Sequence, residues 1–140
     1  MSAALCTIAS IDHLVLTVAS LPRTIAFYTR LGMRHETFSP LNAPDTTRHS
    51  LLFGQSKINL HEKGHEFDPK ATHVQTGSAD LCFVVQDDVQ LVRQRLQEAG
   101  LTLLEGAEVV PRTGAVGPIK SVYLYDPDGN LVELSNYVKK

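Results

Sequence analysis

Three side chains of types that bind divalent metals stand at related places in the sequence. His13 and Asp80 each open an alternating apolar segment, and Glu133 lies in another such segment near the C-terminus. Imidazole and carboxylate groups are common ligands of zinc and other first-row metals. A metal held by these groups could polarise a substrate oxygen, and a carboxylate beside it could move a proton. The residue types therefore suggest one shared metal site.

The segments that the first two of these residues open share one pattern, which indicates a duplicated module. The first segment predicts a strand over 11–18 and then a helix that ends near Gly32. The second predicts a strand over 80–85 and then a helix that ends near Gly100. An internal repeat of this kind predicts two copies of one supersecondary unit.

Both expected helices begin with residues that suit a helix N-terminus. Ser20 can cap the first helix, with Pro22 in its first turn, and either Asp87 or Asp88 can cap the second. Glycine follows each apolar run and suits the left-handed conformation that often ends a helix. Each helix therefore has a defined start and end.

Short apolar runs between turn residues predict the remaining strands. Residues 39–47 and 111–118 are loops by composition, and the Asp-Pro-Asp-Gly run over 126–129 predicts a tight turn. The expected strands cover 33–38, 50–53, 57–62, 101–104, 121–125 and 130–136.

The order of elements predicts an α+β fold of two tandem β-α-β-β-β modules. Module one covers about 11–62, a polar linker covers about 63–78, and module two covers about 79–137. A chain of 140 residues suits one domain that shares a core between two such modules. The sequence therefore predicts a single domain over 1–140.

Strand alternation places several polar side chains on the face that the helices leave uncovered. A polar residue on such a strand usually just faces solvent. The prediction of a site therefore depends on several such residues sharing one face and not on any single residue. The set comprises His13, Asn59, His61, Asp80, Tyr123 and Glu133.

The composition limits the classes of partner. The formal charge is −2 and the chain has no basic run before its last two residues, which argues against nucleic-acid binding. It also lacks both an apolar stretch long enough to span a membrane and the pattern of a signal peptide, so we expect a cytoplasmic protein. Cys6 and Cys82 are expected to be reduced, with Cys82 buried in an apolar strand.

Two segments carry a resemblance to a known family. They are IDHLVLTVASLPRTIAFYTRLGM near the start and YLYDPDGNLVELSNY near the end. With them the chain resembles the vicinal oxygen chelate superfamily, which includes glyoxalase I, bleomycin-resistance proteins and extradiol dioxygenases. The branch most similar is that of glyoxalase domain-containing protein 5 and a lactoylglutathione lyase-like bacterial virulence protein. The resemblance implies sheets that curve around a pocket holding one divalent metal.

The resemblance also implies which residues bind that metal. The positions that match are His13, Asn59, Asp80 and Glu133. Glyoxalase I-like enzymes carry Glu or Gln in place of Asn59 and His in place of Asp80. His61 has the same strand parity as Asn59 and is an alternative ligand. The metal could be Zn, Ni, Co, Mn or Fe, because the general order in which protein sites prefer divalent metals does not by itself select one of them.

The resemblance implies an enzyme that acts on a small carbonyl or vicinal-oxygen compound. Lyase or isomerase chemistry is expected first, with Glu133 as the general base. Arg112, Thr113, Tyr123 and Asn59 are expected to bind the substrate. Because Asn59 stands where a second carboxylate would be, the resemblance does not imply the two-base arrangement of glyoxalase I.

Two other functions stay open. One is an extradiol-type dioxygenase with His13, Asp80 and Glu133 around Fe²⁺ or Mn²⁺. The other is a non-catalytic small-molecule binding or resistance protein in which the polar residues only line a pocket. The resemblance implies a homodimer in each case.

Overall fold

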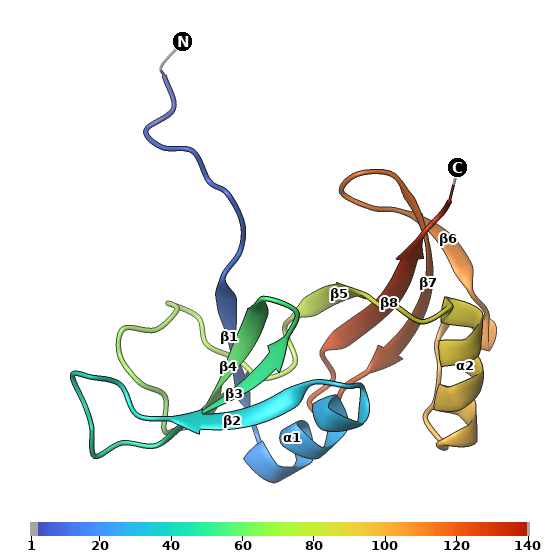
Figure 1. Cartoon of the computed structure of the whole chain (residues 1–140). Coiled ribbons are helices and arrows are strands. Elements are labelled where there is room, and N and C mark those ends of the chain that lie inside the picture. The colour runs from blue at the N-terminus through green and yellow to red at the C-terminus, as the bar shows by residue number, and fades with distance from the viewer. Residues whose placement is uncertain (1–2, 140) are drawn as a thin grey trace. The chain divides into compact units, whose positions relative to one another are not determined.

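The computed structural model describes residues 3–139, which form two compact units. The boundary between them in the sequence lies between Thr72 and His73. Figure 1 shows the elements of both units. Unit 1 contains β1 (His13–Val18), α1 (Leu21–Arg30), β2 (Arg34–Phe38), β3 (Arg48–Phe53) and β4 (Ser56–Glu62). Unit 2 contains β5 (Asp80–Val84), α2 (Val89–Glu98), the short 3₁₀ helix η1 (Glu105–Ala107), β6 (Val110–Thr113), β7 (Pro118–Tyr125) and β8 (Leu131–Tyr137).

The two sheets have the same topology. Unit 1 has the strand order β1-β4-β3-β2, and unit 2 has the order β5-β8-β7-β6. In each sheet the first and last strands of the unit pair in parallel, and the other neighbours pair antiparallel. The predicted α+β class with two β-α-β-β-β modules is therefore confirmed.

The helix of unit 1 begins and ends where its capping residues predict. The Ser20 hydroxyl accepts a hydrogen bond from the Arg23 amide at 3.3 Å. Gly32 takes a φ of +105°, a conformation that costs a residue with a Cβ more than it costs glycine. The helix packs on β2, β3 and β4, and its Tyr28 is fully buried.

The helix of unit 2 uses one of its two candidate caps. The Asp88 carboxylate accepts from the Gln90 amide at 2.9 Å, while Asp87 forms an ion pair with Arg95. Val89 and Leu96 supply the buried side of the helix, which packs on β7 and β8. Because the helix covers that face of the sheet, the opposite face is left for polar side chains.

Two predicted elements of unit 2 are wrong. The strand expected over 101–104 is reduced to a single bridge between Leu103 and Leu124, followed directly by η1. The expected loop over 111–118 contains β6, which pairs with β7. Proline lowers the strand tendency of this run, but β6 is an edge strand, where the missing amide of Pro111 is tolerated.

Within the described residues, no helix is both long and apolar enough to cross a membrane.

Candidate functional site

A pocket of about 350 Å³ opens on the uncovered face of the unit 2 sheet. Two carboxylates from neighbouring strands, Asp80 at the start of β5 and Glu133 in β8, contribute to its wall. Its lining comprises Asp80, Leu104, Glu105, Arg112, Tyr123, Tyr125, Leu131 and Glu133. The structure thus brings together four of the residues that the sequence singled out, namely Asp80, Arg112, Tyr123 and Glu133.

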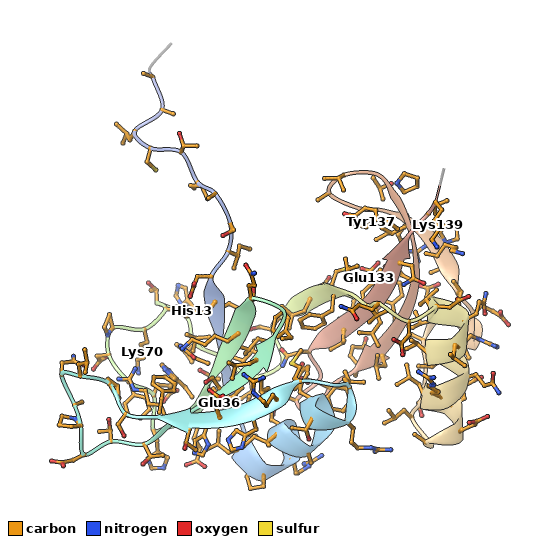
Figure 2. All side chains as sticks on the ribbon, viewed as in Figure 1. His13, Glu36, Lys70, Glu133, Tyr137 and Lys139 are labelled. Atoms are coloured by element: carbon orange, nitrogen blue, oxygen red, sulfur yellow. The ribbon has the colours of Figure 1, made fainter. Side chains whose placement is uncertain are left out.

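Neutral hydroxyl groups hold the Glu133 carboxylate. The Ser121 hydroxyl donates to Glu133 Oε2 at 2.5 Å, and Ser135 Oγ lies 3.4 Å from the same oxygen. Both serines are fully buried, whereas Glu133 (labelled in Figure 2) is half-buried. Hydrogen bonds to an ionised oxygen are stronger than bonds between neutral groups. The carboxylate is therefore stabilised without a bound cation.

Cys82 and Tyr123 flank Glu133 as its register partners on the two neighbouring strands. Burial raises the pKa of the Cys82 thiol, and the charges of Glu133 and Asp80 raise it further. Burial likewise raises the pKa of the Tyr123 phenol, as does the Glu133 charge. Both groups therefore keep their protons at neutral pH. The prediction that Cys82 is buried is wrong, because strand alternation turns it to the open face, where it is exposed and unoxidised.

Arg112 forms the cationic wall of the pocket. Its Nε donates to the Tyr123 hydroxyl at 3.0 Å, and one terminal nitrogen donates to the Pro111 carbonyl at 2.8 Å. The other terminal nitrogen lies 3.5 Å from Glu105 Oε1, longer than a tight charge-assisted hydrogen bond. The guanidinium is thus fixed in orientation while its charge is only loosely paired.

Glu105 itself lies in a strained turn. Its φ is +54° and that of Ala107 is +60°, left-handed values that cost a residue with a Cβ about 1 kcal/mol or more. The Arg93 guanidinium anchors this turn through the Ala107 carbonyl. The turn therefore holds a carboxylate at the pocket wall next to Arg112.

The Asp-Pro-Asp-Gly turn connects β7 to β8, the strand that carries Glu133. Asp126, which is 5 % exposed, accepts hydrogen bonds from the Asp128 amide and from both the amide and the side chain of Asn130. Asn130 Oδ1 in turn accepts from the Ala79 amide at 2.9 Å, directly before Asp80. The turn thus fixes the starts of β5 and β8 together.

His13, the imidazole candidate, lies at the first position of β1 in unit 1 (labelled in Figure 2). Its Nδ1 is 2.7 Å from Asp12 Oδ2. When Nδ1 carries the proton, it donates to this carboxylate and leaves Nε2 as the nitrogen that can bind a metal. A carboxylate on the far ring nitrogen is the usual way in which proteins orient a histidine ligand.

Asn59 and His61 also lie in unit 1, on β4. Asn59 stands opposite Val15 of β1, just as Glu133 stands opposite Cys82 of β5, so the two residues occupy equivalent positions in their modules. Asn59 Oδ1 is buried and has no hydrogen-bond partner among the described residues. An orphaned oxygen of this kind is open to a ligand or a water molecule.

His61 is packed more tightly than the other candidates. It is 7 % exposed and contacts the edge of Phe67, with ring centroids 5.3 Å apart. Arg48 lies 4.0 Å above the same Phe67 ring. Burial lowers the pKa of His61, and the Arg48 charge lowers it further, so the imidazole is neutral at neutral pH. A neutral imidazole can bind a metal, but the Arg48 charge opposes a second cation there.

The remaining candidate, Thr113, is exposed and does not contribute to the pocket, since it alternates with Arg112 along β6. Between Ala3 and Lys139, no three His, Cys, Asp or Glu side chains gather closely enough to hold a metal ion. Asp80 and Glu133, which line one pocket, are oxygen donors of a type that Mn²⁺, Fe²⁺ and Zn²⁺ accept.

The sequence analysis did not single out four polar residues that contact the candidate site residues or line the pocket. They are Asp12, Glu105, Ser121 and Ser135. Ser135 follows Glu133 by two, and Ser121 precedes Tyr123 by two, so strand alternation placed both on the pocket face. Asp12 directly precedes His13. Glu105 carried no such signal, because its turn is set by tertiary contacts.

Comparison with known proteins agrees with this architecture. Residues 10–134 match the model of the Glyoxalase/Bleomycin resistance protein/Dioxygenase superfamily. Glyoxalase domain-containing protein RDO1 of Mycosarcoma maydis is 51% identical over 131 residues, which cover 94% of this chain and 70% of that protein. Virulence protein STM3117 of Salmonella typhimurium is 47% identical over 129 residues, which cover 91% of this chain and 84% of that protein. The chain therefore belongs to this superfamily, as the resemblance implied.

A solved structure from the mobile metagenome of V. Pseudocholerae has the same fold. It superposes with a TM-score of 0.88 at 47% identity, covering 97% of this chain and all of the other. The similarity spans both modules, so the duplicated β-α-β-β-β arrangement is shared along the whole matched length.

Proposed function

We propose that the protein is a glyoxalase-like, metal-dependent enzyme that acts on a small carbonyl or vicinal-oxygen compound by lyase or isomerase chemistry. The observation that carries this proposal is the pairing of Asp80 and Glu133 in one pocket that Arg112 also lines. Superfamily membership supports the choice of reaction class.

The donor set fits a divalent metal. Asp80 and Glu133 would supply oxygen ligands, and His13, oriented by Asp12, would supply an imidazole nitrogen. Asn59 contributes an unpartnered oxygen, and His61 is the less favoured alternative because Arg48 lies beside it. A divalent metal bound to these residues would act as a Lewis acid toward two neighbouring substrate oxygens.

The residues of the pocket would carry the remaining chemistry. Glu133 accepts a proton from the carbon beside the carbonyl and returns it to the neighbouring position, as a general base of this class must. Arg112 orients an oxygen of the substrate through its fixed guanidinium. Tyr123, which stays protonated, donates its hydrogen bond within the same pocket.

Small-molecule binding without catalysis is the second candidate. It is favoured by the Arg112 guanidinium, which Tyr123 orients and which lines the same pocket as the two carboxylates. In that function Arg112 and the carboxylates would recognise a ligand directly.

The test is elemental analysis of the purified protein by mass spectrometry, beside the variants His13→Ala and Thr113→Ala. We expect about one metal per chain in the wild type and in Thr113→Ala, and a loss in His13→Ala. Hemithioacetal isomerisation is then assayed for a Zn or Ni protein, and oxygen uptake for an Fe protein. A wild-type protein that binds none of Zn²⁺, Ni²⁺, Co²⁺, Mn²⁺ or Fe²⁺ would overturn the metalloenzyme proposal in favour of binding alone.

A further inference from the structure

A line of buried hydroxyl groups runs beneath Glu133 and ends at an exposed thiol. Ser121 Oγ is 2.5 Å from Glu133 Oε2, Ser135 Oγ is 2.7 Å from Ser121 Oγ, and Cys82 Sγ is 3.3 Å from Ser135 Oγ. The two serines are fully buried and come from neighbouring strands of the sheet. The line thus crosses three strands, β5, β8 and β7.

The number of protons fixes the direction of every bond in this line. An ionised carboxylate only accepts hydrogen bonds, so Ser121 gives its one proton to Glu133 Oε2. Ser121 Oγ can then only accept from its other neighbour. The Ser135 hydroxyl has two acceptors within reach, Ser121 Oγ at 2.7 Å and Glu133 Oε2 at 3.4 Å, and it donates to the nearer one. Ser135 Oγ in turn accepts from the Cys82 thiol. Each bond therefore points toward Glu133, and aligned bonds of this kind strengthen one another.

The other module provides an internal comparison. Asn59 occupies the place in β4 that Glu133 occupies in β8, yet its side-chain oxygen is buried without a partner among the described residues. Ser50, the buried register partner of Asn59 on β3, gives this oxygen no hydrogen bond. The hydroxyl contacts of Glu133 Oε2 therefore have no counterpart at Asn59 Oδ1 among the described residues.

We propose that Ser121, supported by Ser135, is a positioning residue that fixes the Glu133 carboxylate through Oε2 and so holds it in the orientation that metal binding or proton transfer needs. The inference rests on the proposed function of Glu133 as ligand and base. A carboxylate whose orientation is already fixed binds without the entropy loss of an unrestrained side chain. The chain would thus prepare Glu133 before any ligand arrives.

The experiment measures Co²⁺ binding by titration and records the visible spectrum of the Co²⁺ protein. Ser121→Ala is expected to weaken binding about tenfold, the usual cost of removing a group that orients a ligand, and to alter the spectrum. Ser135→Ala, which leaves the bond from Ser121 in place, should weaken binding less, roughly threefold. Cys82→Ala lies at the exposed end and should have the smallest effect of the three.

Thr24→Val is the matched control, since it removes a buried hydroxyl in α1 that lacks a partner among the described residues. It should leave Co²⁺ affinity unchanged. Ser121→Thr keeps the hydroxyl and should restore both affinity and spectrum. Equal affinity and an unchanged spectrum in Ser121→Ala, with binding lost in Glu133→Gln, would overturn the positioning role while the proposed function stands.

A wild-type protein that binds no metal would instead contradict the proposed function. The positioning role is then decided by crystal structures of the metal-free wild type and of Ser121→Ala. We expect one Glu133 rotamer in the wild type and several in the variant. The same single rotamer in both would overturn the inference. If Ser121→Ala does not fold, the graded effects of Ser135→Ala and Cys82→Ala decide it, and no effect in either overturns it.

Discussion

At the scale of single residues, the site is distinguished by how its charges are compensated. Glu133 is held by hydroxyl groups, while Arg112 is oriented by Tyr123 and only loosely paired with Glu105. A carboxylate in a tight ion pair would be poorly available to a metal or a proton. These residues are instead ordered and still available, which is what binding and proton transfer require.

Glu133→Gln tests whether this carboxylate is a ligand. Glutamine keeps the shape but is neutral, so we expect metal affinity to fall by at least about tenfold with the fold intact. Metal content by mass spectrometry and far-ultraviolet circular dichroism provide the two measurements. Gln94→Glu on the exposed face of α2 serves as a charge-changing control. Unchanged metal content in Glu133→Gln would remove Glu133 from the ligand set.

Asp80→His tests the other carboxylate. Glyoxalase I-like relatives carry histidine at the matching position, so we expect this variant to retain or tighten binding of Zn²⁺ or Ni²⁺. Isothermal titration with each ion measures the change, with Asp80→Ala as the variant that should lose affinity. If both variants lose the metal equally, Asp80 does not contribute a ligand.

At the scale of elements, the site depends on the turn between β7 and β8. Asp126 closes this turn with three hydrogen bonds, and Asn130 connects it to the residue before Asp80. Because neighbouring strands must stay in register, a slip of one residue would move Glu133 to the helix-covered face. The turn therefore determines which side chains reach the pocket.

Asp126→Ala should lower the free energy of unfolding by about 2–3 kcal/mol, because it leaves buried donors without their charged acceptor. Urea denaturation followed by circular dichroism measures the loss. Asp45→Ala, in the exposed loop before β3, is the control and should change little. A stability equal to the wild type would show that the carboxylate does not hold the turn.

At the scale of the whole molecule, the helix-covered side of the unit 1 sheet contains a pair of histidines that links stability to pH. His35 Nε2 and His49 Nδ1 are 2.9 Å apart. Burial lowers the pKa of His49, as does the charge of His35, while Glu62 raises it in part. The unfolded chain therefore binds a proton more readily than the folded protein does.

The free energy of unfolding should therefore be highest above about pH 6.5, the ordinary pKa of histidine, and should decrease as the pH falls below this value. His49→Gln removes the titrating ring while keeping a hydrogen-bonding side chain, so we expect a flatter dependence between pH 5 and 7.5. Urea midpoints across this range provide the measurement, with His73→Gln in the exposed linker as the control. An identical slope in the wild type and His49→Gln would contradict this assignment.

Much of this architecture follows from local patterns in the sequence. The duplicated modules, both helix caps and the turn at 126–129 were predictable because hydrophobic periodicity and capping chemistry act over a few residues. Alternation also placed Asp80, Tyr123 and Glu133 on one face. The expected single domain, cytoplasmic location and homodimer stay predictions.

Tertiary structure decided the rest, because pairing between distant strands is not encoded locally. Backbone pairing with β7 made a strand of the Pro-containing run at β6, and it reduced 101–104 to one bridge. The pairing of β7 with β8 aligned Ser121 and Ser135 beside Glu133, across strands that the sequence could place only separately. The sequence by itself determined which residues share a face, and the register between strands decided which of them touch.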